Sequence, residues 1–226
     1  MNILAIECTH QVACVAVSNG SRIVELVNGD WQKTAEAIVP LVMQAMSDAG
    51  LSPDGLDAVA VSSGPGSFTA LRIGMSVAKG IAYGAGCPLV PVPTLQAMAA
   101  AACSRTEATY VVPLIPSRPG ECFYSVFRRE AGSCIVEEID SDRCMAAELA
   151  ERLKSYAGEV VIPVRDVAAL LSYAPELRDL AVDASFFTAS SLLPFAENAV
   201  GQGVAATPGE ASPDYRQIFV PLKKKQ

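Results

Sequence analysis

The chain has 226 residues, of which 51% are hydrophobic, and a formal net charge of −7 at pH 7. This composition predicts a folded protein with one large domain or two modest ones, and excludes an intrinsically disordered chain. The acidic balance argues against a stand-alone nucleic-acid-binding protein, because the only basic run, residues 223–225, is most simply a solvated tail.

Seven cysteines are scattered along the chain and none has a CxxC spacing. This pattern predicts small core residues in a reducing compartment, and therefore a cytoplasmic protein, rather than a disulfide framework or a zinc site. The first residues, MNILAIE, carry no basic leader and reach a carboxylate at Glu7. We therefore expect neither a signal peptide nor a membrane-spanning segment there.

In the first half, short apolar runs alternate with turn signals and two long segments of helical spacing. Thr34 and Ser67 stand where their hydroxyls can cap helices, and Gly50 ends the first one. The expected strands are residues 2–6, 12–17, 23–27, 56–61 and 89–92, and the expected helices are residues 34–49, 68–84 and 94–103.

The second half begins after a short polar break at residues 104–108 and repeats the same order of elements. Strands are expected at residues 111–115, 122–127, 134–139, 160–162 and 180–182, and helices at residues 145–156, 167–171 and 191–200. The repetition predicts two small α/β domains, residues 1–104 and 105–226, with a cleft between them. A helix near residues 191–202 is expected to pack back on the first domain.

Residues 59–84, VAVSSGPGSFTALRIGMSVAKGIAYG, predict a strand, a tight loop and a helix. One stripe of this helix is polar and two are apolar, one through Phe68, Leu71 and Met75 and the other through Ile73 and Val77. A helix that is apolar on two of three sides needs two surfaces to bury against. The sequence leaves open whether both surfaces belong to its own domain or one belongs to a partner.

Several catalytic sites are excluded by the residues present. His10 is the only histidine, so a paired-histidine metal site is impossible. Ser67 does not lie in a G-x-S-x-G elbow, and Thr69 replaces the third glycine of a dinucleotide fingerprint. No G-x-x-x-x-G-K-[ST] phosphate loop is present.

A nucleotide site remains conceivable where the first strand ends. In actin-like kinases a carboxylate there helps to hold the magnesium of ATP. The rival hypothesis is therefore a small actin-like ATPase or kinase that uses Glu7, Thr9, Gly64, Gly66 and Ser67. The equivalent later turn has Pro116, Ser117 and Arg118 and no acid before Glu121, so a solvated Glu7 at a strand end is the favoured interpretation.

The motifs resemble one known family. The first strand with Glu7 and Thr9, the run SGPGSFTALRIG at residues 63–74, and RPGE at residues 118–121 look like the TsaB (YeaZ) family of bacterial tRNA threonylcarbamoyladenosine biosynthesis proteins. The resemblance covers residues 1–127 and reappears at residues 213–216. It implies an actin-like (ASKHA, ribonuclease H-like) duplicated fold in which two mixed sheets are flanked by helices.

The resemblance also implies a function without catalysis by this chain. Family members are similar to the transferase subunit TsaD but lack its metal-binding histidines. They dimerise with TsaD through the two N-terminal helices and support modification of adenosine 37 in tRNAs that read ANN codons. An ATPase subunit, TsaE, joins the complex, so ATP and a metal ion are expected in the partner subunits, no cofactor in this chain, and tRNA contact only through the complex.

The chain departs from the family pattern around the nucleotide site rather than along the helix. The family usually has Asp at Glu7, Gly at Ala70 and an aspartate at Pro116, and residues 163–165, PVR, replace a glycine-bearing turn. These departures argue against nucleotide binding by this chain.

The partner surface is expected on the two N-terminal helices, and the chain alone is expected to form a homodimer through it. The residues predicted to form this surface are Ile38, Val42, Met46, Phe68, Leu71, Arg72, Ile73, Met75 and Val77. Which stripe of the second helix faces the partner is undecided.

Overall fold

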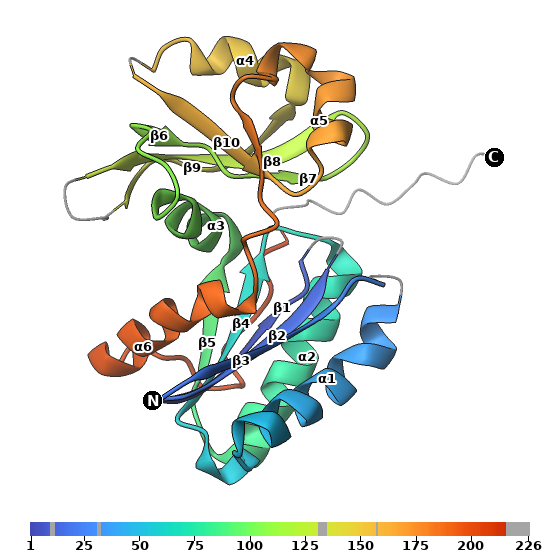
Figure 1. The fold of residues 1–226 in the computed structure, drawn as a ribbon, viewed down its shortest axis with the longest axis vertical. Coiled ribbons are helices and arrows are strands. Elements are labelled where there is room, and N and C mark those ends of the chain that lie inside the picture. The colour runs from blue at the N-terminus through green and yellow to red at the C-terminus, as the bar shows by residue number, and fades with distance from the viewer. Residues whose placement is uncertain (10–11, 31–32, 131–134, 157, 216–226) are drawn as a thin grey trace.

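The computed structural model describes residues 1–9, 12–30, 33–130, 135–156 and 158–215. The first sheet has the strand order β3-β2-β1-β4-β5, in which β1 is antiparallel to β2 and parallel to β4 (Figure 1). Its strands are β1 (Asn2–Glu7), β2 (Ala13–Asn19), β3 (Ile23–Asn28), β4 (Ala58–Gly64) and β5 (Leu89–Pro93). The helices of this half are α1 (Thr34–Ala49), α2 (Phe68–Ala85) and α3 (Thr94–Cys103).

Glycines end the two long helices as their spacing predicts. Gly50 after α1 and Gly86 after α2 adopt left-handed angles, with φ of 69° and 67°, which a side chain would disfavour. The predicted hydroxyl caps are wrong, because neither helix has a side-chain hydrogen bond at its N-cap. Thr34 is instead the buried first residue of α1, and the Ser67 carbonyl oxygen accepts a hydrogen bond from Leu71 N at 2.9 Å.

The second sheet repeats the strand order of the first. Strand β8 (Glu121–Arg129) pairs with β9 (Ile135–Met145) on one side and with β6 (Tyr110–Val111) and β7 (Leu114–Pro116) on the other. Strands β10 (Val160–Val164) and β11 (Ala181–Asp183) continue from β6 as parallel strands. The single strand predicted at residues 111–115 is thus two short strands, interrupted around Pro113, which has no N–H to donate.

The helices of the second half are α4 (Ala146–Leu153), α5 (Val167–Tyr173) and α6 (Leu193–Gln202). Helix α4 begins one residue later than predicted because β9 continues through Met145, and it ends three residues earlier, at Leu153. Two mixed sheets with the same element order and flanking helices confirm the predicted duplicated α/β fold. Among the described residues no helix is long and apolar enough to span a membrane.

Three apolar cores hold the layers together. One lies between the first sheet and α1 and α2, and another lies between the second sheet and α4 and α5. The third joins the two halves: it contains Ile3 of β1 and Phe123 of β8, with Met98 of α3 and Ala196 of α6. Figure 1 shows α3 between the two sheets and α6 on the face of the first sheet opposite α1 and α2. The halves are therefore braced against each other by shared apolar packing.

Candidate functional site

The Glu7 carboxylate, where the first strand ends, is fully buried, and the prediction of a solvated Glu7 is wrong. Its Oε1 accepts hydrogen bonds from Thr9 N at 2.9 Å and Thr9 Oγ1 at 2.5 Å, and Oε2 accepts one from Ser62 Oγ. Arg165 Nη1 lies 3.3 Å from Oε1. The chain's own donors therefore surround this carboxylate.

Arg165 reaches Glu7 from the opposite half of the molecule. It follows β10 directly and its side chain is only 6% exposed. Its Nη2 donates a hydrogen bond to Phe187 O, and the guanidinium carbon lies 5.1 Å from the centroid of the Phe187 ring. The residue is the last of the PVR stretch, residues 163–165. A guanidinium here supplies the positive charge that a magnesium ion would otherwise bring, so Glu7 does not fit the role of a metal ligand.

Other residues of the chain also fill the space around the loop of residues 64–67. Gly64 N donates to Thr94 Oγ1 at 3.1 Å, and Ser67 N donates to Thr9 O at 2.9 Å. A Cβ at Gly64 would overlap the Asp214 carbonyl oxygen, and one at Gly66 would lie 2.8 Å from Thr9 Cβ. These two glycines are needed for close approach of the protein's own backbone rather than for approach of a phosphate.

Cys8 next to Glu7 is a packing residue. Burial, and then the charge of Glu7, raise the pKa of the Cys8 thiol to about 12. The thiol donates to Ala70 O at 3.2 Å. A protonated, enclosed thiol is a poor nucleophile, so it adds no chemistry to this end of the sheet.

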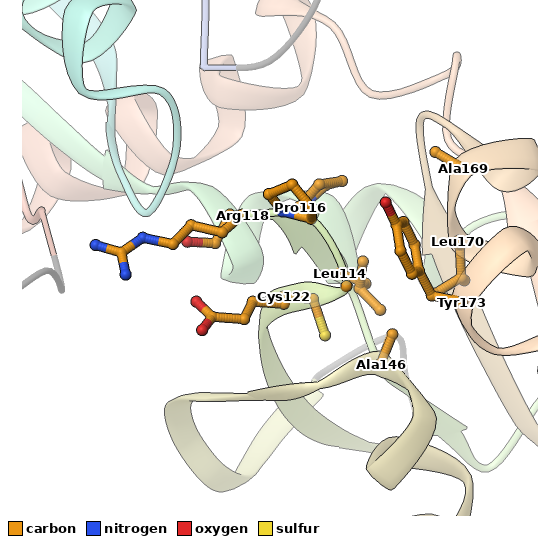
Figure 2. Close-up of a pocket in the computed structure, with 12 residues that line it drawn as sticks. Leu114, Pro116, Arg118, Cys122, Ala146, Ala169, Leu170 and Tyr173 are labelled. Carbon is orange, nitrogen blue, oxygen red and sulfur yellow. The ribbon is translucent and has the colours of Figure 1, made fainter.

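The turn of the second half that corresponds to the end of β1 borders a cavity of about 210 Å³. Figure 2 shows Leu170 and Tyr173 of α5 on one wall and Leu114, Pro116 and Cys122 opposite, while Arg118 points away. Pro116 stands at the strand end and offers no carboxylate. The lining is mostly apolar, so this cavity does not supply the second half of a nucleotide site.

No group of three or more metal-binding side chains is found among the described residues. His10 lies outside the described residues. With Glu7 and the glycine loop both occupied, the residues present do not fit a magnesium nucleotide.

An open apolar groove of about 500 Å³ lies between α1 and α2. Two of its residues on α1, Val39 and Met43, are 46% and 68% exposed. The groove is lined by Val39, Val42, Met43, Met46, Ser47, Leu51, Pro53, Ser76, Val77, Gly80 and Ile81. Contiguous apolar surface of this kind is typical of protein–protein contact sites.

The structure separates the residues predicted for the partner surface into three groups. Ile38, Leu71 and Met75 are buried in the core beneath the helices, so their predicted exposure to a partner is wrong. Val42 and Met46 line the floor of the groove but are each only 6% exposed, so most of their predicted exposure is wrong as well. Val77 lines the groove and is half-buried, and Ile73 is half-buried against the core. Phe68 is 44% exposed and Arg72 is exposed. Of the two apolar stripes on α2, the one through Leu71 and Met75 faces the sheet.

Sequence reasoning missed Val39 and Met43. They follow each other at a spacing of four, one position after Ile38 and Val42, and form a second apolar stripe on α1. That doubled stripe was the available signal, because a helix packed on one sheet needs only one.

Comparisons with known proteins agree on one family. The model for TsaD, tRNA N6-adenosine threonylcarbamoyltransferase, matches residues 32–206. The tRNA threonylcarbamoyladenosine biosynthesis protein TsaB of Escherichia coli K12 is 32% identical over 162 residues, which cover 71% of this chain and 70% of that protein. The TsaB protein of Haemophilus influenzae is 34% identical over 130 residues, 58% of this chain and 55% of that protein.

Solved structures support the fold. A Pseudomonas aeruginosa protein described as similar to peptidase YEAZ superposes with a TM-score of 0.82 at 21% identity, over 96% of this chain and 99% of that chain. A second structure, YeaZ from the same organism, gives a TM-score of 0.77 at 21% identity, over 95% and 99% of the two chains.

Proposed function

The chain belongs to the TsaB family of tRNA threonylcarbamoyladenosine biosynthesis proteins, and we propose that it is a non-catalytic subunit in that modification. In this role it dimerises with a TsaD-like transferase and supports threonylcarbamoylation of adenosine 37 in tRNAs that read ANN codons. A TsaE-like ATPase joins the complex in the cytoplasm. tRNA, ATP and the metal ion are bound by the complex or by its other subunits.

The observation that carries the proposal is the open groove between α1 and α2. Val39 and Met43 remain largely exposed, although each buried side chain of this size is worth about 1.5–3 kcal/mol. A partner helix that covers the groove would also shield the half-buried Ile81. Without the transferase, a second copy of the chain fits the same face and forms a homodimer.

The occupied strand end supports the absence of catalysis. Glu7 is neutralised by Arg165, and the loop of residues 64–67 is filled by Thr9 and Asp214. An ATPase would need both features free.

The proposal is tested by co-expressing the tagged chain with the TsaD transferase of the same organism in a host that lacks its own TsaB. We expect the two chains to co-purify in equal amounts and to restore modified adenosine in the host tRNA. A chain that neither self-associates in sedimentation nor retains the transferase would overturn the proposal.

Calorimetry with ATP and magnesium separates this proposal from the ATPase alternative. The isolated chain is expected to release no binding heat. Tight binding that is lost in Glu7→Ala would instead establish an enzyme.

A further inference from the structure

Asp214 and Tyr215, the last two described residues, contact the loop of residues 64–67 and the start of α2. Asp214 donates its backbone N–H to Ser63 O at 2.6 Å. The Tyr215 ring then packs on Phe68, with ring centroids 4.7 Å apart at a tilt of 43°. These contacts tie the end of the described chain to the helix that carries the groove.

Arg72 completes this cluster and is held in one orientation by both aromatic residues. Its guanidinium carbon lies 3.9 Å from the Phe68 ring centroid and 5.6 Å from that of Tyr215. Arg72 Nε donates a hydrogen bond to the Tyr215 hydroxyl at 3.1 Å. Stacking and this hydrogen bond fix the guanidinium plane, so less side-chain entropy remains to be lost on binding.

The charge of Arg72 is not neutralised within the described part of the chain. No carboxylate among those residues lies within ion-pair distance of it, and the side chain is exposed. Because Nε donates to Tyr215, a carboxylate can form its two parallel hydrogen bonds with the two terminal NH2 groups.

The cluster borders the groove. Arg72 lies one helical turn before Ser76, a groove residue, which corresponds to about 6 Å along the helix axis. A partner that lies along α2 in the groove is therefore one helical turn from Arg72 and needs only to extend that far to reach it.

We propose that Phe68, Arg72 and Tyr215 form a carboxylate-binding site at the edge of the docking groove, and that the protein partner places an Asp or Glu side chain against Arg72. Tyr215 is a positioning residue that acts through Arg72, so the C-terminal segment is part of the interface. The inference rests on the proposed function, and it adds the chemistry by which the partner is recognised.

The test measures the affinity of full-length variants for the TsaD transferase of the same organism by titration calorimetry. Arg72→Ala is expected to weaken binding by about tenfold to a hundredfold, because charge-assisted bidentate pairs are the stronger hydrogen bonds. Arg72→Lys keeps the charge but loses the planar fork, so most of the loss should persist. Tyr215→Phe keeps the ring and should weaken binding less than Tyr215→Ala.

Arg105 provides the matched control. It is exposed and likewise lies over an aromatic ring, 5.1 Å from the centroid of Phe186, but outside the groove. Arg105→Ala should leave the affinity within about twofold. The salt dependence gives a second readout: the fall in affinity between low and high NaCl should be smaller for Arg72→Ala and Tyr215→Ala than for the wild type.

The outcomes separate the two proposals. If the wild-type chain binds the transferase and Arg72→Ala behaves like Arg105→Ala in affinity and salt dependence, the carboxylate site is wrong and the proposed function stands. If the wild-type chain does not bind the transferase at all, both fail.

Discussion

The corresponding helices α1 and α4 have opposite outer surfaces, although each follows an edge strand of its sheet, β3 or β9. On α4 the outer face carries ion pairs, between Arg152 and Glu148 at 3.4 Å and between Lys154 and Glu151 at 2.5 Å. On α1 the outer face carries Val39 and Met43, both exposed. The fold itself does not require an apolar outer surface, so the one on α1 is specific to the first half and points to a contact made there.

The two strand ends differ in the same way. Glu7 at the end of β1 is buried and paired with Arg165, whereas Pro116 at the end of β7 borders an apolar cavity. A nucleotide site of this fold class needs an accessible acidic residue at each of the two strand ends, and neither strand end has one. The first half is therefore distinguished by its exposed apolar surface on α1 and not by a nucleotide site at the end of β1.

The largest effect is expected from breaking the buried ion pair. Arg165→Ala should lower the free energy of unfolding by about 3–5 kcal/mol, because it leaves the buried Glu7 charge without its partner. Urea denaturation measures this change. Replacing both residues, as Glu7→Gln with Arg165→Met, should recover most of the loss.

The second half offers a matched control for that pair. Arg143 and Glu121 lie 3.8 Å apart with side chains 44% and 27% exposed. Arg143→Ala should change stability by less than about 1 kcal/mol. Equal losses for Arg143→Ala and Arg165→Ala would show that burial of Glu7 is not what distinguishes the first strand end.

A smaller effect is expected where α2 approaches β1. A Cβ at Gly74 would lie 2.6 Å from Cys8 Sγ, so Gly74→Ala should destabilise the chain by about 1–3 kcal/mol. Cys8→Ala in the same chain should relieve the clash. A Cβ at Gly84, on the same helix, would meet no neighbouring element within 4 Å, and Gly84→Ala should stabilise by up to about 1 kcal/mol in thermal unfolding. Similar changes at both glycines would argue against close packing of α2 on the strand end.

The smallest effect concerns the charged outer face of α4. Glu148→Gln removes an exposed ion pair with Arg152. The Glu148 side chain is 57% exposed and the Arg152 side chain is 41% exposed, so the free energy of unfolding should fall by only about 0.3–0.5 kcal/mol. The transferase affinity should not change. A clear loss of affinity in calorimetry would mean that α4 also contacts the partner.

Much of the fold could be predicted because its signals are local. Gly50 and the apolar spacing fixed the ends of α1, and the family prediction from the run at residues 63–74 is confirmed. Burial of Glu7 could not be predicted, because its ion-pair partner lies 158 positions away and no local pattern connects them. The sequence also could not predict which side of α2 is buried, because its two apolar stripes are alike. Only the packing on the sheet shows that the stripe through Leu71 and Met75 is the buried one.

The central claim, that the groove between α1 and α2 is the docking surface, is tested most directly by comparing Met43→Asp with Val204→Asp. Both residues are 68% exposed, but only Met43 lines the groove. Sedimentation with the TsaD transferase should show that Met43→Asp weakens the complex by more than about a hundredfold, since a charge would be buried without a partner, while Val204→Asp binds like the wild type. Equal binding by the two variants would contradict the account.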